Sequence, residues 1–295
     1  MNEPYWPDFN DLWNYNDPAG TEARFRELLP EAEPGSSYHL QLLTQIARAL
    51  GLQSRFAAAH LLLDEVEAQA DSESLVLVRL LLERGRAFNS AGQPQQAVPL
   101  FQQAAALGEK LQVDFYTVDA LHMLGIAAPP AERLDWNRQA IQAAEGSSDP
   151  HARRWLASLY NNTGWTLFDT GHYQQALDLF EKAVSERQQM DNEENLRIAR
   201  WCVARTLRAL GEPGRALVIQ RELAEDGPGD GFIEEELGEC LLALDQPEIA
   251  RRHFARAYDL LSQLEWVAQD EQRMARLKEL GGLAGAAAWP DEDGG

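Results

Sequence analysis

Apolar residues recur along most of the chain at spacings of three and four, which is the period of an amphipathic helix. The stretch 157–190 shows this pattern most clearly, as two segments on either side of a short break at 169–171. Small or apolar residues at these spacings share one face of each segment: Tyr160, Gly164, Leu167, Ala176, Phe180 and Ala183. The stretch therefore predicts two helices joined by a tight turn, with small residues where the helices approach closely.

The same two-helix pattern recurs along the chain. A small or apolar residue in the expected first helix marks each repeat, at intervals of 38, 36, 43, 40 and 34 residues by subtraction: Ala47, Gly85, Leu121, Gly164, Ala204 and Gly238. Turns inside the repeats are expected at Gly92, Gly171, Gly211 and Asp245. The third repeat departs from the pattern, because two prolines at 129–130 stand where its turn should be.

The stretch 157–190 resembles a tetratricopeptide repeat (TPR), whose period is about 34 residues. The residues that carry this resemblance are Gly164, Gly171, Tyr173, Ala176, Phe180 and Ala183. Across 40–261 the resemblance implies an all-α fold, a right-handed α-solenoid (superhelix) of about six to seven TPR-like helical hairpins. In such folds the first helices line a concave groove that holds a peptide. The segment 160–165 is most similar to repeats of kinesin light chains and of bacterial peptide-binding TPR proteins.

Changes in composition divide the chain into four parts. Residues 1–37 form an aromatic and acidic segment with a capping helix expected over 21–31, and 38–262 form the TPR array. Residues 263–280 are expected to form a polar cap helix that shields the last repeat. The glycine-rich, acidic tail 281–295 is expected to be disordered. Ala, Leu, Glu, Gln and Arg dominate the sequence and no strand-like alternation persists, which supports the all-α prediction.

The chain of 295 residues carries a formal net charge of −21, which disfavours binding to nucleic acid or to an anionic membrane. Its positive charge is nearly all arginine, the residue best suited to bidentate recognition of carboxylate or phosphate. Cys202 and Cys240 are its only cysteines and form no CxxC motif, as expected of a reduced intracellular protein. Without a secretory signal or a membrane-spanning run, the sequence predicts a cytoplasmic protein.

Helical geometry selects the side chains that would face the predicted groove. Relative to the small residue of each first helix, the positions three and two before it and one and four after it point away from the second helix. Arg79 joins this set from one turn earlier. The residues that we predict to bind peptide are Arg48, Arg79, Arg86, Asn89, Asp119, His122, Asn161, Asn162, Trp165, Arg205 and Arg208.

Five of these residues are arginines, which would face a groove in an otherwise acidic protein. Guanidinium groups held in a concavity attract a carboxylate-bearing ligand and pair with it. The alternative is that these arginines are solvated and are balanced by Glu83, Asp119 and the glutamates of the last repeat.

Asn161 and Asn162 would hold a peptide backbone, because a side-chain amide offers both a donor and an acceptor. Trp165 would supply an apolar floor beside them. The alternative is that the asparagines bond to neighbouring residues or to water, and that the tryptophan packs between repeats.

These patterns predict a non-catalytic protein-interaction module, without a cofactor or a metal, that binds an acidic or carboxylate-bearing peptide of a protein partner in its groove. A self-associating scaffold, a homo-oligomer formed through the groove or the termini, is a second hypothesis. A further hypothesis is that the tail around Trp289, a tryptophan among acidic residues, enters the groove and competes with the ligand.

Asp119 and His122 support a third, enzymatic hypothesis. They lie three residues apart on one helix face and would serve as two metal ligands or as an acid–base pair. No third ligand has suitable spacing and the HExxH motif is absent. The sequence favours a hydrogen-bonded polar pair over catalysis for these two residues.

Overall fold

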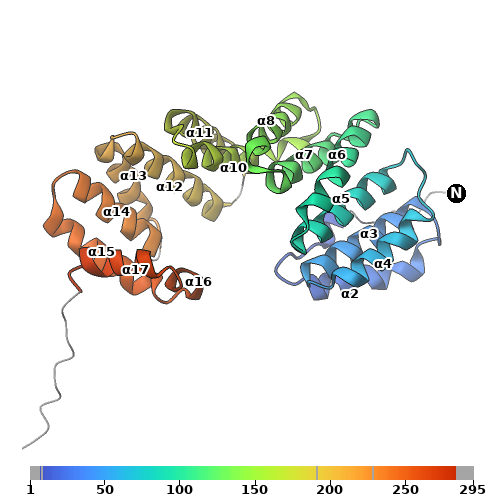
Figure 1. The fold of residues 1–295 in the computed structure, drawn as a ribbon, viewed down its shortest axis with the longest axis horizontal. Coiled ribbons are helices and arrows are strands. Elements are labelled where there is room, and N and C mark those ends of the chain that lie inside the picture. Colours follow the sequence, from blue (N-terminus) through green and yellow to red (C-terminus); the bar gives the residue numbers. More distant parts are fainter. Residues whose placement is uncertain (1–6, 8, 191, 228, 284–295) are drawn as a thin grey trace, which may run out of the picture. The chain divides into compact units, whose positions relative to one another are not determined.

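The computed structural model describes residues 7, 9–190, 192–227 and 229–283, and these residues form helices, turns and loops. The chain divides into two compact units, Met1–Leu159 and Tyr160–Gly295. In each unit, consecutive helices pack side by side as hairpins, and neighbouring hairpins pack on each other (Figure 1). The predicted all-α solenoid is confirmed.

The first unit contains a short N-terminal helix pair and three helical hairpins. Its helices are α1 (Phe9–Leu12), α2 (Pro18–Leu28), the 3-10 helix η1 (Leu29–Glu31), α3 (Ser37–Leu52), α4 (Phe56–Glu67), α5 (Leu75–Ser90), α6 (Pro94–Lys110), α7 (Asp114–Ala127), α8 (Pro130–Gly146) and α9 (Pro150–Arg153). The hairpins are α3–α4, α5–α6 and α7–α8.

The division between the units falls within α10 (Leu156–Asp169), which precedes α11 in the hairpin predicted over 157–190. The helices that follow are α11 (Tyr173–Gln188), α12 (Glu193–Ala209), α13 (Pro213–Glu225), α14 (Gly231–Ala243), α15 (Pro247–Leu261), α16 (Glu265–Ala268) and α17 (Glu271–Leu280). The pairs α12–α13 and α14–α15 are hairpins, and α17 packs on α15.

A glycine in the first helix allows a phenylalanine of the second helix to approach the backbone in three hairpins. A Cβ added to Gly85 would lie 2.5 Å from the Cε1 atom of Phe101, which is completely buried. Gly164 and Gly238 meet the rings of their own hairpins at 2.7 and 2.8 Å in the same way. These contacts form the centre of each hairpin and confirm the predicted close approach.

The third repeat makes this approach at a different place. A Cβ on Gly125 would lie 1.9 Å from the Oδ1 atom of Asn137, which is buried in α8. The marker that the sequence placed at Leu121 therefore lies one turn before the closest contact. A smaller polar side chain replaces the phenylalanine here, and α7 ends just before the two prolines.

The turns lie where the sequence predicted them. Gly92, Gly171 and Gly211 have φ of 75°, 80° and 81°, and Asp245 has φ of 57°. This left-handed conformation ends a helix and suits glycine, which has no Cβ to clash with the backbone. Several second helices begin with a proline, as in α6, α13 and α15, because a proline at the first helical position loses no intrahelical hydrogen bond.

The two ends of the array differ in detail from the expected elements. The helix expected over 21–31 begins earlier, at Pro18, because Asp17 caps it by accepting a hydrogen bond from Gly20 N at 2.9 Å. The segment 263–280 forms two helices, α16 and α17, rather than one. The tail 284–295, with the hypothesis about Trp289, lies outside the described residues.

Gln220 in α13 is fully buried, and neither atom of its amide has a hydrogen-bond partner within the described residues. An unpaired buried polar group costs about 1–3 kcal/mol. We expect Gln220→Met, which keeps the volume and removes the polar atoms, to raise the free energy of unfolding by about 1–2 kcal/mol. Thermal unfolding followed by circular dichroism measures the change.

The control for this prediction is Gln175→Met in α11, where the side chain is exposed and the change should stay within about 0.5 kcal/mol. A Gln220→Met protein that unfolds at a lower temperature than the parent would contradict the prediction. It would show that the buried amide is satisfied, for example by an ordered water.

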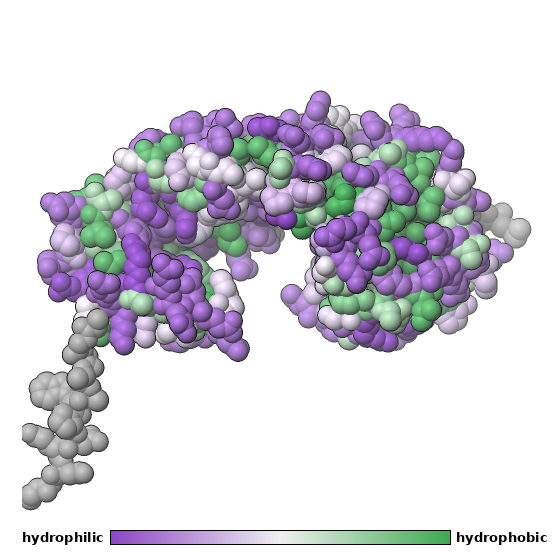
Figure 2. Space-filling model, viewed as in Figure 1, coloured by the Kyte–Doolittle hydropathy of each residue, from purple (hydrophilic) through white to green (hydrophobic). Residues whose placement is uncertain are grey.

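Hydrophilic residues cover most of the visible surface of each unit, with hydrophobic patches between them (Figure 2). No helix within the described residues is both long enough and apolar enough to span a membrane.

Candidate functional site

Arg86 lies at the centre of a buried charge cluster in the first unit. It donates hydrogen bonds to Glu83 at 2.6 Å and to the two carboxylate oxygens of Asp119 at 2.5 and 2.6 Å. Only 15% of the Arg86 side chain is exposed. Burial alone would lower the pKa of Arg86, but the two carboxylates outweigh it and raise the pKa above its ordinary value. The charge of Arg86 is therefore compensated by two carboxylates from its own unit.

Arg48 and Arg79 are held mainly by aromatic rings. The Arg48 guanidinium lies 5.3 Å from the ring centres of both Trp13 and Tyr15, and 3.8 Å from Glu83. Arg79 donates a hydrogen bond to the Tyr116 hydroxyl. Its guanidinium lies 4.9 Å from the rings of Tyr116 and Phe9. Three of these rings come from the N-terminal segment, so part of the predicted arginine face of the first unit is used for packing.

Asp119 and His122 do not form the predicted hydrogen-bonded pair. Asp119 bonds to Arg86 instead, and the Nδ1 atom of His122 is buried with no hydrogen-bond partner within the described residues. The His122 ring packs 5.0 Å from that of Trp155, and burial lowers its pKa. Asn89 lies half-buried in α5, about one turn beyond Arg86.

The enzymatic hypothesis gains no support from its surroundings. Among the residues that the structure describes, no three or more His, Cys, Asp or Glu side chains are grouped so that they could hold a metal ion.

In the second unit, Arg205 lies among three aromatic rings. Its guanidinium is 5.2 Å from the ring centre of Trp201 and 5.8 Å from those of Trp165 and Phe168. The two tryptophan rings are themselves 6.0 Å apart, so α10 and α12 present one aromatic surface around the arginine. We call these four residues the Arg205 cluster. Stacking of this kind orients a guanidinium while leaving its edge free for hydrogen bonds.

The nearest acid, Glu236, is shared unequally between two arginines. Arg208 binds it through two hydrogen bonds of 2.8 and 3.0 Å, whereas Arg205 lies 3.5 Å from the same carboxylate. Burial alone would lower the pKa of Arg208, but Glu236 outweighs it and raises the pKa. Arg205 therefore retains charge that its neighbours do not fully compensate, and 33% of its side chain is exposed.

The two asparagines differ in their surroundings. Asn161 is half-buried and accepts a weak hydrogen bond from the thiol of Cys202, at 3.6 Å from Sγ to Oδ1. Burial raises the pKa of that thiol to about 12, which keeps it protonated as a donor. Asn162 is exposed. Because Asn162 and Trp165 are three residues apart in α10, they lie on one face of the helix.

An apolar pocket of about 390 Å³ lies beside the Arg205 cluster. Its lining comes from the N-terminal half of α12 and from the start of α14, and it includes Ile198, Trp201 and Phe232. Trp201 belongs both to the pocket and to the Arg205 cluster. The predicted binding residues include neither Trp201 nor the other pocket residues. The sequence signal that was available is the position of Trp201, three residues before Ala204 and therefore on the predicted groove face.

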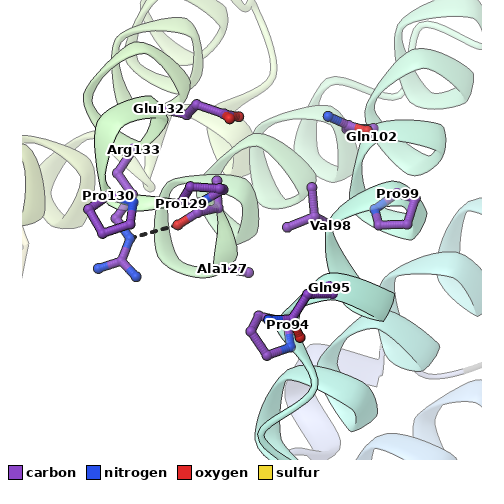
Figure 3. A pocket seen from close by; sticks show the side chains of 11 residues that line it. Pro94, Gln95, Val98, Pro99, Gln102, Ala127, Pro129, Pro130, Glu132 and Arg133 are labelled. Atoms are coloured by element: carbon purple, nitrogen blue, oxygen red, sulfur yellow. Dashed lines mark hydrogen bonds between the residues drawn. The ribbon is translucent and has the colours of Figure 1, made fainter.

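A second pocket, of about 560 Å³, lies in the first unit between the N-terminal part of α6 and the start of α8. Figure 3 shows Pro94, Val98 and Pro99 on one side and Pro129 and Pro130 on the other. Arg133 donates a hydrogen bond to the carbonyl oxygen of Ala128 at 2.9 Å and so caps the C-terminal end of α7 (Figure 3). Among the described residues that line this pocket, Arg133 has this structural role and Glu132 is the remaining charged group, so the arrangement offers little to hold a charged ligand.

Family models match two of the hairpins. A model described as tetratricopeptide repeat matches residues 156–190, and one described as tetratrico peptide repeat matches residues 78–114. The first covers α10 and α11, and the second covers α5 and α6. None of the curated proteins matches the chain.

Several crystal structures share the fold. The apo form of RapI is 12% identical, with 93% of this chain and 80% of that chain covered and a TM-score of 0.72. A chain of the APC/C hetero-tetramer Cut9–Hcn1 is 16% identical, with coverage of 93% and 50% and a TM-score of 0.61. A tetratricopeptide repeat protein from Parabacteroides merdae is also 16% identical, with coverage of 93% and 96% and a TM-score of 0.51.

Stacked hairpins with a glycine-to-phenylalanine contact at their centre define an α-solenoid repeat protein, a class that generally serves protein–protein interaction rather than catalysis. The family models and the shared fold specify the class further. The chain is a tetratricopeptide repeat protein.

Proposed function

We propose that this protein is a non-catalytic interaction module that binds a carboxylate-bearing peptide segment of a partner protein, with Arg205 as the anchor. The observation that carries the proposal is the incomplete pairing of Arg205. Its side chain is one-third exposed, three aromatic rings orient it, and its nearest carboxylate already accepts two hydrogen bonds from Arg208. A ligand carboxylate would complete the pairing with charge-assisted hydrogen bonds.

Asn162 and Trp165 support the same anchor from α10. Asn161 already bonds to Cys202, so the exposed amide of Asn162 is the one available to a peptide backbone. Trp165 is half-buried, with the ring of Phe180 5.3 Å away on one side and Arg205 near it on another. It therefore serves mainly to orient the arginine, and only its exposed part would contact a ligand.

The predicted residues of the first unit are less suited to anchor a ligand. Arg86 has two carboxylate partners, and Arg79 is held by Tyr116. Arg48 is stacked against two rings and faces Glu83. A ligand would have to displace these contacts, and each displacement would reduce the net affinity.

The proposal predicts that Arg205→Glu weakens peptide binding. Random 12-residue peptides displayed on phage would be selected on the wild-type protein, and we expect enrichment of peptides with Asp or Glu. A hydrogen bond to a charged group contributes about 1.5–3 kcal/mol. Loss of this contact should therefore lower the affinity for an enriched synthetic peptide by roughly tenfold or more, as measured by fluorescence anisotropy.

Arg252→Glu is the matched control, because Arg252 is an exposed arginine of α15 and its replacement makes the same change in net charge. Asn162→Ala should lower the affinity for the same peptide less, by roughly two- to tenfold, and should leave the helical content of the protein unchanged. Equal losses for Arg205→Glu and Arg252→Glu would refute the anchor. Binding that depends only on the overall charge would explain such a result.

A further inference from the structure

Exposed apolar side chains gather at the pocket beside the Arg205 cluster. Ile198 is 48% exposed at its edge. Phe232, which lines the pocket, stacks on Trp266 of α16 with ring centres 5.8 Å apart, and Trp266 itself is 67% exposed. Trp201 donates its indole N–H to the Phe232 carbonyl oxygen at 3.4 Å, which fixes the wall between the pocket and Arg205. Exposed apolar groups that gather around a preformed cavity mark a binding site.

The mouth of this pocket is acidic. Glu194 and Asp230 both line it, and Glu193 precedes Glu194 in the first turn of α12. Within the described part of the chain, neither glutamate takes part in an ion pair, and both are exposed. The one arginine in the lining, Arg197, lies against the loop after α13, since a Cβ on Gly227 would fall 2.7 Å from its guanidinium. The pocket therefore combines an apolar interior with two carboxylates at its edge. Glu194 has no ion-pair partner within the described residues, and Asp230 caps α14 through Oδ1, which accepts hydrogen bonds from the Phe232 and Ile233 amides at 2.8 and 3.4 Å.

We infer that this pocket is a second subsite, which takes a large apolar side chain of the bound peptide and places a neighbouring Lys or Arg of that peptide against Glu194 and Asp230. The inference rests on the proposed function, because Trp201 joins the pocket to the Arg205 anchor. The ligand is then a short bipolar segment, with a carboxylate at one end, an apolar anchor in the middle and a basic residue at the other end. Charge complementarity at the two ends fixes its direction along α12.

The spacing along α12 sets the spacing in the ligand. Trp201 and Arg205 are one helical turn apart, which is roughly 6 Å along the axis. An extended peptide covers that distance in about two residues. Glu194 lies seven residues before Trp201, which is roughly 10 Å in the opposite direction, so the basic residue should lie about three positions beyond the apolar one.

The phage selection described above tests this inference with the random 12-residue library as the probe. We expect enriched peptides to carry an acidic residue about two positions from a large apolar one and a Lys or Arg about three positions beyond it on the other side. Enrichment of acidic peptides that share no apolar or basic position would overturn the subsite but would still support Arg205 as the anchor. Apolar and basic positions without an acid would overturn the anchor. No enrichment over uncoated wells would overturn both.

A charge reversal at the mouth adds a quantitative test. Glu194→Lys should weaken an enriched peptide about fivefold at low salt, since exposed charge pairs contribute modestly and a reversal replaces attraction by repulsion. Glu181→Lys in α11 is the matched control, an exposed glutamate outside the pocket lining, and should change the affinity less than about twofold. Replacing the basic residue of the peptide by Ala should abolish the difference between the two variants. A difference that persists would overturn the assignment of that residue to Glu194.

Discussion

Phe101→Ala is expected to destabilise the α5–α6 hairpin by about 3–5 kcal/mol, the usual cost of removing a fully buried phenylalanine. Phe101 is completely buried, and its ring lies directly against the backbone at Gly85. Because that glycine has no side chain, it offers no atoms to fill the space that the ring leaves. Hydrogen exchange measured by mass spectrometry should show loss of protection concentrated in α5 and α6.

A second substitution turns this prediction into a test of the glycine contact. Gly85→Ala alone should destabilise the hairpin, because its Cβ would lie 2.5 Å from the Phe101 ring, even though Ala favours a helix by about 1 kcal/mol. In the Phe101→Ala background the same change should become stabilising. Leu61→Ala in α4, where the side chain is exposed, controls for loss of apolar volume and should have little effect. Equal effects of Gly85→Ala in both backgrounds would show that ring and glycine are not coupled.

The hairpins could be predicted from the sequence because their determinants are local. The glycine of the first helix, the turn glycine and the phenylalanine of the second helix fall within one repeat, as Gly164, Gly171 and Phe180 do. A helix has a fixed period, so these spacings give the buried face directly. The third repeat escaped this reasoning, because Asn137 and Gly125 make its central contact with different residue types.

The candidate site could be predicted only in part. Helical periodicity indicates the face on which Arg86 and Arg208 lie, but not the partners that they meet. Those partners, Asp119 and Glu236, come from the next repeat, 33 and 28 residues away. Two acids at predicted groove positions, Glu83 and Glu236, are buried under arginines rather than solvated. Which side chains pair depends on how one hairpin packs on the next. The pattern of residues along the sequence does not give this packing.

The aromatic residues around the arginines show the same limit. The sequence indicated a cluster of rings near the N-terminus and a tryptophan in α10. Helical spacing places Phe168, Trp201 and Arg205 on the predicted groove face, but it does not show that the rings surround the arginine. It gives no reason to place Trp13 against Arg48. These contacts bring together side chains from different helices, so they follow from the stacking of repeats.

Asp119→Ala is expected to destabilise the first unit by roughly 3 kcal/mol, the lower end of the cost of breaking a buried ion pair. Asp119 is almost completely buried, and both of its oxygens accept hydrogen bonds from Arg86. The substitution leaves that guanidinium largely buried with Glu83 as its remaining partner, and this partner keeps the cost from being larger. Urea unfolding compared with Asp135→Ala, which removes an exposed partner of Arg138, measures the difference, and the control should lose no more than about 0.5 kcal/mol.

The double variant Asp119→Ala with Arg86→Met separates a structural charge cluster from a ligand site. If the cost of Asp119→Ala comes from an uncompensated guanidinium, removal of that guanidinium should recover most of the lost stability, because apolar side chains replace buried ion pairs at little net cost. Recovery would assign Arg86 to the core of the first unit and leave Arg205 as the arginine available to a partner. An Asp119→Ala protein as stable as the parent would instead mean that Arg86 reaches solvent easily. Arg86 would then compete with Arg205 as the anchor for a carboxylate.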